Sequence, residues 1–474
     1  RPSVVCGVLV VMMMEQFIRV ILKCSVLCSF ITAAVAGDVP PCGLPLYLTP
    51  LIRSGNLTGA RAESRSNPLK GNITSFSGFL TVNDRYNSNL FFWYFVAETN
   101  PTKAPVILWL QGGPGTSALS GVFNDNGPFY VKLHRGLKQR KYYWSQIAHM
   151  IYIDSPIGTG FSFTDNRAGY ARNANQIADN LYESLLQYFA VFQELRFNDF
   201  YIVGESYGAK FATMLAYKID LMNPRSLLKI NLKGIALQNA VYDPANMMIY
   251  SDYLYQIGLV DAKGKTQLQQ QETRISNLMS QRKYIDAFRF FDAMIGGEMS
   301  QWKTSFQNLT YYNLYYNFLH FKEDTPYGSY KEYIKKDVVR HSLHVGNLTF
   351  HLDQNVKLLL VNDLMASVKS TIESLLEKYR IMFYVGQMDI IVNYPLIVNA
   401  IKKLRWSGAL QYDKEPRKVW KVDDSIAGYS KSVKKFTEIL VLNAGHRVSY
   451  DQPKRALDMI KRFVTGQPFT AEQD

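Results

Sequence analysis

The chain carries a Gly-x-Ser-x-Gly pentapeptide, Gly204-Glu205-Ser206-Tyr207-Gly208, directly after the apolar run 200–203. A serine hydroxyl is a weak nucleophile, so it must stand clear of the surrounding sheet with a base beside it. The glycines tolerate the sharp turn and the close backbone approach that such a strand-to-helix elbow requires. So short a pattern also recurs by chance, and its meaning depends on the segments around it. We take Ser206 as the candidate nucleophile.

Short apolar runs recur along the chain, with helix-like segments between them. We expect strands at 106–110, 150–153, 200–203, 234–237, 381–385 and 439–442, and helices at 173–194 and 208–222. Near-continuous apolar strands that alternate with helices indicate an α/β protein with a mainly parallel central sheet flanked by helices. The aromatic-rich stretch 76–96 instead predicts an antiparallel hairpin.

The composition changes between residues 243 and 370. This segment is rich in Tyr, Gln, Lys and Met and shows helical periodicity without buried-strand runs. We interpret it as a helical insertion, or lid, over the carboxyl end of the sheet, where it would shape the substrate cleft. The core would then consist of 37–242 and 371–474.

The N-terminal region has the pattern of a secretory signal. Arg19 and Lys23 form a positive segment, an apolar stretch follows, and the small residues 34–36 resemble a cleavage site. We therefore expect a signal peptide at 14–36 and extraneous or incomplete sequence at 1–13. No later run approaches 18 apolar residues, so no membrane span is expected.

Glycosylation sequons and cysteine usage agree with entry into the secretory pathway. Asn-x-Thr sequons, which are candidate glycosylation sites, begin at Asn56, Asn72, Asn308 and Asn347. Three of the four cysteines fall within residues 1–36, so Cys42 would be the single cysteine of the mature chain. A mature chain with one cysteine has no internal disulfide, so Cys42 would be a free thiol or half of an intermolecular bridge.

Charge and composition exclude several classes of function. The formal net charge is +14, but the chain has no compact Lys/Arg run, so nucleic-acid binding is not expected. His341, His344 and His351 lack the further ligands that a metal site needs, and we expect them on an exposed loop. No metal and no cofactor are therefore predicted.

Two polar residues follow the late predicted strands and complete a catalytic set with Ser206. Asp389 comes after the strand at 381–385, and His446 comes after the strand at 439–442. Sheets of the α/β-hydrolase fold carry their triad in the chain order Ser, acid, His, in loops at strand ends. We expect His446 to accept the Ser206 proton and Asp389 to hold the imidazole tautomer and stabilise its cation.

The oxyanion hole is expected from two backbone N–H groups. One belongs to Tyr207, which follows the nucleophile, and the other belongs to the loop 111–115, where we select Gly113. A phosphate-cradle interpretation of this loop is weaker, because no Gly-Lys-Ser/Thr follows it.

Several blocks in order make the chain similar to the serine carboxypeptidases, and most closely to their vitellogenic-like branch. The blocks are Trp109-Leu110-Gln111-Gly112-Gly113-Pro114-Gly115, residues 152–163, Gly204-Glu205-Ser206-Tyr207, residues 386–392, Ala427-Gly428-Tyr429, Ala444-Gly445-His446 and residues 450–453. The resemblance covers nearly the whole chain after residue 36. It implies an α/β-hydrolase fold with a helical lid.

The resemblance also implies an activity: removal of one C-terminal residue from peptides and proteins through an acyl-enzyme, usually at acidic pH and without a cofactor. In the family, acidic residues hold the substrate's free carboxylate, and Gln111, Asp125 and Glu205 match those positions. Paired acids retain a proton below neutrality, so we expect activity to fall as this cluster titrates. The resemblance places such a protein in a lysosome or outside the cell.

The chain departs from the family at several positions. Asp125 stands where the family usually has Glu, Thr116 replaces a common Cys, and Ser449 replaces a common Pro. Arg447 follows His446 where an apolar residue is usual. It would either add a positive charge near the leaving amino acid or point to solvent. The family's Gly-x-Gly after the strand at 234–237 is also replaced, around 238–240.

Three alternative functions share this fold. An acyltransferase would pass the acyl group to an alcohol, and a lipase or esterase would use the same triad on esters. A catalytically impaired secreted homologue would keep the fold without the chemistry. Glu205 beside the serine favours peptide carboxylates over ester substrates, and labelling by a fluorophosphonate would separate the enzymes from the non-catalytic protein.

Overall fold

The structure is a computed structural model that describes residues 40–469, apart from 68, 133–134, 324–327 and 353. The predicted signal peptide and the segment before it lie outside the described residues. Among the described residues, no helix combines the length and the apolar character needed to cross a bilayer.

Ten strands in the described part of the chain form one twisted sheet in the order β1-β2-β6-β3-β7-β8-β9-β12-β11-β10. Its strands are β1 (Ser75–Asn83), β2 (Ser88–Phe95), β3 (Val106–Leu110), β6 (His149–Ile153), β7 (Phe200–Glu205), β8 (Leu232–Gln238), β9 (Arg380–Gly386), β10 (Lys418–Val422), β11 (Ser425–Val433) and β12 (Phe436–Val441). Strands β6, β3, β7, β8, β9 and β12 run parallel, and antiparallel pairs flank them. β4 (Phe129–Lys132) and β5 (Gly136–Gln139) form a separate hairpin.

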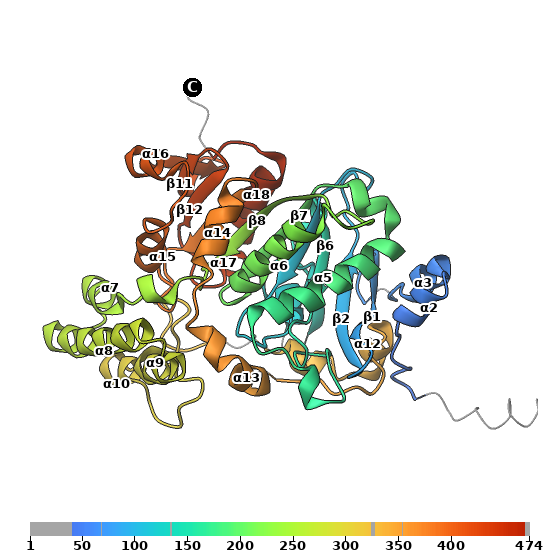
Figure 1. Ribbon diagram of the computed structural model, residues 1–474, viewed down its shortest axis with the longest axis horizontal. Helices are drawn as coiled ribbons and strands as arrows, with labels where there is room; N and C mark the ends of the chain where they lie inside the picture. Colours follow the sequence, from blue (N-terminus) through green and yellow to red (C-terminus); the bar gives the residue numbers. More distant parts are fainter. Residues whose placement is uncertain (1–39, 68, 133–134, 324–327, 353, 470–474) are drawn as a thin grey trace, which may run out of the picture.

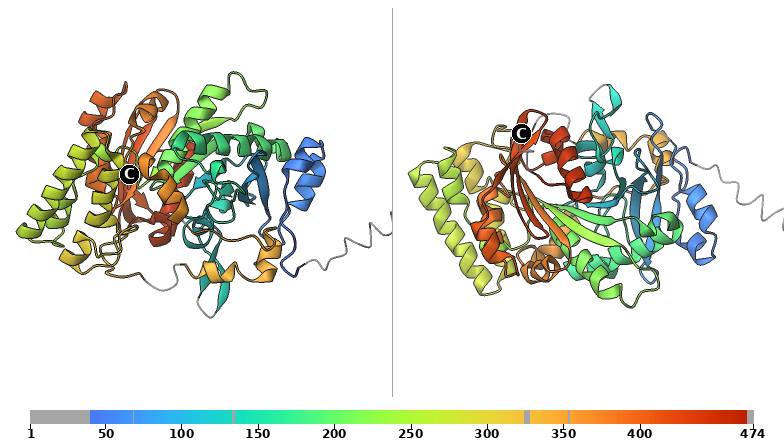
Figure 2. Two further views of the ribbon diagram at one scale, coloured as in Figure 1. Left: turned by 60° about the horizontal axis from the view of Figure 1, so that its bottom comes forward. Right: turned by 90° about the horizontal axis from the view of Figure 1, so that it is seen from above.

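Both faces of the sheet are covered at its centre, and the central strands such as β3 and β7 are buried along their whole length. Along β3, Val106, Leu108 and Leu110 belong to one core cluster, whereas Ile107 and Trp109 belong to the other. Alternate side chains of a strand point to opposite faces, so a strand buried on both sides shows no polar alternation. This arrangement confirms the predicted α/β class with a mainly parallel sheet (Figure 2).

Helices from distant parts of the sequence form the two covering layers. α5 (Ala174–Val191), α6 (Gly208–Met222), α14 (Lys369–Leu376) and α15 (Tyr394–Ile401) contribute to one core cluster; α4 (Leu119–Asn124), α12 (Asp337–Ser342) and α18 (Pro453–Thr465) contribute to the other. α5 begins at an Asn173 cap, whose side chain accepts a hydrogen bond from the Gln176 N–H. It buries Ile177, Leu181 and Leu185, which recur every four residues on one helical face.

The remaining helices are short, apart from those between β8 and β9. They are α2 (Thr49–Arg53), α3 (Leu57–Glu63), α16 (Ala409–Lys414), α17 (Val448–Asp451), η1 (Trp144–Gln146), η2 (Arg167–Gly169) and η3 (Gln193–Phe197). Between β8 and β9 lie η4 (Pro244–Asn246), α7 (Tyr250–Gln256), α8 (Ala262–Ser280), α9 (Tyr284–Phe291), η5 (Asp292–Gly296), α10 (Ser305–Thr310), α11 (Tyr330–Tyr333), α12, α13 (Gln354–Leu364) and α14.

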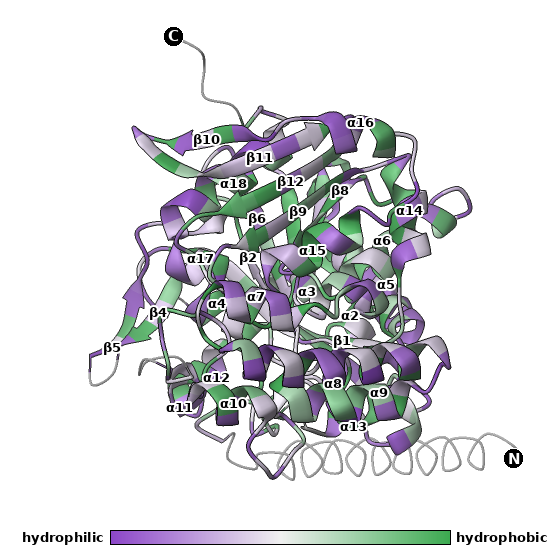
Figure 3. Cartoon of the chain, turned by 90° about the vertical axis from the view of Figure 1, so that its left-hand side faces the viewer, coloured by the Kyte–Doolittle hydropathy of each residue, from purple (hydrophilic) through white to green (hydrophobic). Residues whose placement is uncertain are grey.

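The helices between β8 and β9 lie in two places. α7–α10 form a group at one side of the molecule (Figure 1). Many residues of α8 are polar and are coloured purple in Figure 3. Residues 328–352 instead pack against the core on the β1 side, where Tyr330 stacks on Phe123 and Val345 bridges to Pro45. The predicted insertion 243–370 therefore contributes both a projecting helical group and a segment that wraps the core.

Candidate active site

The strand-to-helix elbow at 204–208 is present, with Ser206 between the end of β7 and the start of α6. Ser206 has a φ of +56°, a backbone conformation that non-glycine residues rarely adopt outside constrained sites. A Cβ at Gly204 would lie 2.2 Å from the Gly208 carbonyl oxygen, and one at Gly208 would lie 2.3 Å from the Leu110 carbonyl oxygen. The two glycines are therefore required by close backbone approach.

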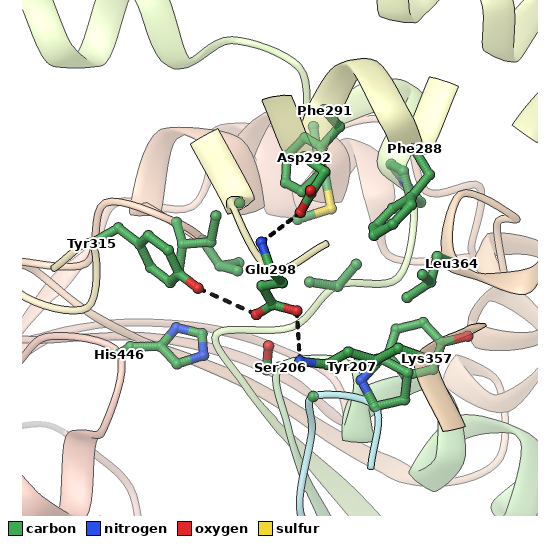
Figure 4. A pocket seen from close by; sticks show the side chains of 18 of the residues that line it. Ser206, Tyr207, Phe288, Phe291, Asp292, Glu298, Tyr315, Lys357, Leu364 and His446 are labelled. Atoms are coloured by element: carbon green, nitrogen blue, oxygen red, sulfur yellow. Dashed lines mark hydrogen bonds and ion pairs between the residues drawn. The ribbon is translucent and has the colours of Figure 1, made fainter. Parts of the chain in front are cut away.

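His446 and Asp389 are joined by a hydrogen bond at the carboxyl ends of β12 and β9. His446 Nδ1 lies 2.7 Å from Asp389 Oδ2, and both side chains are buried. The Val392 N–H donates to the other carboxylate oxygen at 3.1 Å. With Nδ1 engaged by the carboxylate, Nε2 is the ring nitrogen left to act as a base. His446 and Ser206 line the same pocket (Figure 4).

The predicted oxyanion donors lie in this pocket too. Gly113 and Tyr207 both line it beside Ser206. Gly113 has a φ of +110°, and a Cβ at Gly112 would lie 2.6 Å from the Glu205 carbonyl oxygen. Tyr207 precedes the first residue of α6, so its N–H belongs to the positive end of the helix dipole. The arrangement suits stabilisation of a negative oxygen near Ser206.

Gln111 and Glu205 form a hydrogen-bonded pair at the pocket wall. Gln111 Nε2 donates to Glu205 Oε1 at 2.8 Å, and Gln238 Nε2 donates to Glu205 Oε2 at 3.2 Å. Trp109 Nε1 in turn donates to Gln111 Oε1 at 2.8 Å, which orients the amide. Burial, and next the nearby Asp125 carboxyl, hold the pKa of Glu205 well above its ordinary value.

Asp125 is brought near this pair but takes a different place. It is buried, and it is not among the described residues that line the pocket, unlike Gln111 and Glu205. No hydrogen-bonding group of the described residues reaches either of its carboxylate oxygens. Burial raises the pKa of Asp125 to about 7, although the positive charges of Arg447 and Arg140 oppose the shift. Asp125 therefore acts on Glu205 through its charge.

The pocket combines apolar walls with an ion pair. It encloses about 160 Å³, and its apolar lining includes Met247, Met248, Phe288, Phe291, Leu364 and Met365. Glu298 points into it and pairs with Lys357 of α13 at 2.8 Å, and the Tyr315 hydroxyl donates to the same carboxylate at 3.2 Å (Figure 4). The lid thus brings charged groups close to Ser206, a feature that the sequence analysis did not anticipate.

Arg447 faces the pocket and forms an ion pair with Glu323 at 2.7 Å. Its guanidinium carbon lies 4.5 Å from the centre of the Tyr316 ring, and that ring stacks on His446 at 5.1 Å. Its side chain is only 12% exposed. Of the two alternatives for Arg447, the structure therefore favours a positive charge beside His446.

Two groups that support the site were not predicted from sequence. Asn239 Nδ2 donates to Asp389 Oδ2 at 2.5 Å, and the Tyr316 carbonyl accepts a hydrogen bond from the His446 N–H at 2.6 Å. Asn239 follows directly after β8 and has a φ of +40°, so a polar residue at a strand end was an available signal. Tyr316 belongs to the lid, and no sequence pattern linked it to His446.

The other candidate residues lie away from this pocket. The predicted glycosylation sites Asn56, Asn72, Asn308 and Asn347 are all exposed.

Cys42 is a free thiol in this structure, and its side chain is buried. The exposed loop expected for the three candidate metal-site histidines is wrong: His341 lies in α12, and His344 and His351 are partly buried. His344 Nδ1 lies 3.0 Å from Ser77 Oγ. No group of three or more His, Cys, Asp or Glu within the described residues is arranged to hold a metal ion.

Known proteins share both the sequence and the fold. A family model described as serine carboxypeptidase matches residues 67–466. The venom serine carboxypeptidase of Apis mellifera is 45% identical over 90% of this chain and 92% of its own. The vitellogenic carboxypeptidase of Aedes aegypti is 41% identical over 89% of this chain and 90% of its own. The crystal structure of Kex1(delta)p, a prohormone-processing carboxypeptidase from Saccharomyces cerevisiae, superposes on this chain with a TM-score of 0.71. The match covers 83% of this chain and 92% of that chain at 22% sequence identity, which shows a similarity of fold.

Proposed function

The chain belongs to the serine carboxypeptidase family and is a serine-type carboxypeptidase, and we propose that Ser206, His446 and Asp389 carry out its chemistry. The observation that supports this assignment is the His446–Asp389 hydrogen bond of 2.7 Å in a pocket shared with Ser206. The three residues follow the carboxyl ends of β7, β9 and β12, which run parallel in one sheet.

The reaction proceeds in two halves. Ser206 Oγ attacks the last peptide carbonyl while His446 Nε2 takes its proton, and the N–H groups of Gly113 and Tyr207 stabilise the oxyanion. The C–N bond then breaks, and the imidazolium gives its proton to the leaving amine. Water attacks the resulting ester with His446 again as base, the bond between Ser206 Oγ and the acyl carbon breaks, and the imidazolium returns its proton to Ser206 Oγ as the shortened peptide leaves as the free acid. Asp389 holds the ring orientation throughout and stabilises the imidazolium.

The free carboxylate of the substrate is recognised by Gln111 and Glu205. A buried carboxyl whose pKa is raised stays protonated and can donate a hydrogen bond to a carboxylate, which a charged glutamate would repel. Burial alone suffices for this state at acidic pH, and ionised Asp125 raises the pKa of Glu205 further, so Glu205 keeps its proton when Asp125 has lost its own. An amide- and acid-lined wall beside the nucleophile supports a peptide carboxylate as substrate over an ester, and it supports activity at acidic pH.

The decisive experiment compares two substrates and two proteins at about pH 5. An N-blocked dipeptide should release its C-terminal amino acid, whereas the C-terminally amidated dipeptide and the Ser206→Ala protein should release none. Equal cleavage of both substrates would contradict carboxylate recognition. Absence of cleavage together with absence of fluorophosphonate labelling would contradict catalysis.

We also propose that the protein passes through the secretory pathway to a lysosome or the extracellular space. Exposure of Asn56, Asn72, Asn308 and Asn347 supports glycan attachment at these sites. Glycosidase treatment of the protein expressed in a eukaryotic cell should reduce its apparent mass, and an unchanged mass would contradict glycosylation.

A further inference from the structure

A fully buried lysine lies on the first turn of α6, one turn after the nucleophile. Lys210 Nζ donates to the backbone carbonyl oxygens of Asp363 at 2.6 Å and of Leu364 at 3.1 Å, and its side chain is inaccessible to solvent. These carbonyls end α13, where the helix dipole favours a cation. The lysine therefore joins the helix of the nucleophile to a helix of the lid.

The same end of α13 holds the side chain of Tyr207. The Tyr207 hydroxyl donates to Asp363 Oδ2 at 2.5 Å, and Asp363 Oδ1 accepts a hydrogen bond from the Ala174 N–H at 3.2 Å. Lys210 Nζ also lies 4.8 Å from the centre of the Tyr207 ring and 3.9 Å from Asp363 Oδ2. Tyr207 is thus held at its hydroxyl, while its backbone N–H is the proposed oxyanion donor.

The opposite part of α13 reaches the substrate pocket. Lys357 pairs with Glu298 there, and it lies six residues before Asp363, which corresponds to about 9 Å along a helix. Figure 4 shows Lys357, Glu298 and Tyr207 around Ser206. One helix therefore contacts both the charged lining of the pocket and the residue next to the nucleophile.

Such an arrangement is costly unless it is fully satisfied. A buried ammonium or carboxylate requires partners, and removing one partner leaves the other unpaired. An apolar side chain at position 210 would pack against α13 without this cost, so packing alone does not account for a lysine. The charged groups of Lys210 and Asp363 instead fix geometry, because they hold the Tyr207 hydroxyl and the carbonyls of residues 363 and 364 in defined positions.

We propose that Asp363 and Lys210 are positioning residues of the oxyanion hole. By holding the Tyr207 side chain, they keep the Tyr207 N–H aimed at the oxygen that becomes negative beside Ser206, and turnover then depends on the docking of α13. This inference rests on the proposed function of Ser206 and Tyr207. It needs no contact between Asp363 or Lys210 and the substrate.

The chain offers a matched control at the far end of α6. There Asp220 accepts hydrogen bonds from the Tyr379 hydroxyl at 2.9 Å and from Lys378 Nζ at 2.7 Å, which is the same chemical set away from the pocket. The test compares Asp363→Ala with Asp220→Ala, and Tyr207→Phe with Tyr379→Phe. Folding is followed by circular dichroism and thermal unfolding.

Asp363→Ala should lower kcat about tenfold and leave KM within about twofold, because a displaced oxyanion donor acts mainly on the transition state. Asp363→Asn should restore most of the rate, since its side-chain oxygen still accepts the Tyr207 hydrogen bond. Tyr207→Phe should lower kcat about threefold, because only one hydrogen bond is lost.

A second readout separates positioning from general damage. An N-blocked amino aldehyde forms a tetrahedral adduct with the serine, so its affinity should fall by the same factor as kcat in Asp363→Ala. The product acid forms no oxyanion, so its inhibition constant should not change. Both inhibitors should bind Asp220→Ala as they bind the wild-type protein.

Equal kcat values for each variant and its α6 control would overturn the inference, as would a loss that appears only in KM. If Asp363→Ala does not fold, Tyr207→Phe decides between the two outcomes, because it keeps the ring and removes only the hydroxyl. Failure of the proposed function would look different: the wild-type protein itself would not distinguish the free dipeptide from its amide.

Discussion

Catalytic efficiency should fall as the pH rises through neutrality, because the buried Asp125 near the carboxylate-binding Glu205 then loses its proton. The pKa of Asp125 is raised to about 7 by burial. Its protonated fraction therefore decreases from about nine-tenths at pH 6 to about one-tenth at pH 8. The negative charge that Asp125 then carries repels the substrate carboxylate, so kcat/KM should fall about tenfold over this range, through KM more than kcat.

Asp125→Asn is the matched perturbation, because it keeps the shape and cannot ionise. Burial, the larger cause, still raises the pKa of Glu205 in this variant. We expect kcat/KM to change less than about threefold between pH 6 and pH 8.

The stability of the same variant gives an independent check. A carboxyl with a raised folded pKa destabilises the fold increasingly as the pH rises from about 4 to about 7, by about 4 kcal/mol in full. Asp125→Asn should therefore be more resistant to denaturant than the wild type at pH 8, and this difference should vanish near pH 4.

The assay follows amino-acid release from an N-blocked dipeptide across this pH range. Fluorophosphonate labelling of Ser206 serves as the control, because that reagent carries no C-terminal carboxylate and its rate should not fall between pH 6 and pH 8. The reasoning would be refuted by a wild-type rate that climbs steadily to pH 8. It would also be refuted if Asp125→Asn lost activity in parallel with the wild type.

Three further substitutions test other parts of the site. Asp389→Asn should lower kcat by about 10³–10⁴ with little change in KM, because the imidazole would take the wrong tautomer; steady-state kinetics that show a loss below tenfold would contradict its role. Arg447→Val should lower kcat/KM about two- to fivefold more for peptides ending in Asp or Glu than for those ending in Leu, as expected for a partly exposed charge pair; equal losses would show that Arg447 does not read the leaving residue. Gly386→Ala places a Cβ 1.9 Å from the Gly445 carbonyl oxygen, so denaturant titration should show a loss of about 1–3 kcal/mol, and unchanged stability would contradict the close approach of the two loops.

The sequence predicted the elements that carry the proposed catalytic residues because each of these residues lies next to a strong local signal. The strand expected at 106–110 is observed at that position, and the helix expected at 208–222 is α6. Ser206, Asp389 and His446 follow apolar runs, and loops after parallel strands converge at one edge of a sheet. Local patterns were sufficient here because the fold itself brings strand ends together.

The supporting contacts were not predictable in the same way. Tyr207 and Asp363 are 156 residues apart, and no sequence pattern at either residue indicates that the two form a hydrogen bond. Among the described residues, no hydrogen-bond partner reaches the Asp125 carboxylate, and this depends on where neighbouring side chains end, which sequence spacing does not give. Residues 328–352 have helical character like the rest of the lid, so their path across the core depends on tertiary packing alone.

Residues 315–318 link the loop that carries Asp389 to the loop that carries His446, and this link bears on the order of folding. The Tyr315 carbonyl accepts hydrogen bonds from the N–H groups of Ile390 and Ile391. The Tyr316 carbonyl accepts a hydrogen bond from the His446 N–H. Contacts between such distant segments form late, after the entropy of closing long loops has been overcome. A chain with a complete sheet but an undocked lid would therefore be compact and still lack a competent base. In amide hydrogen exchange, the His446 N–H should open together with the lid backbone and not with the strands beside it.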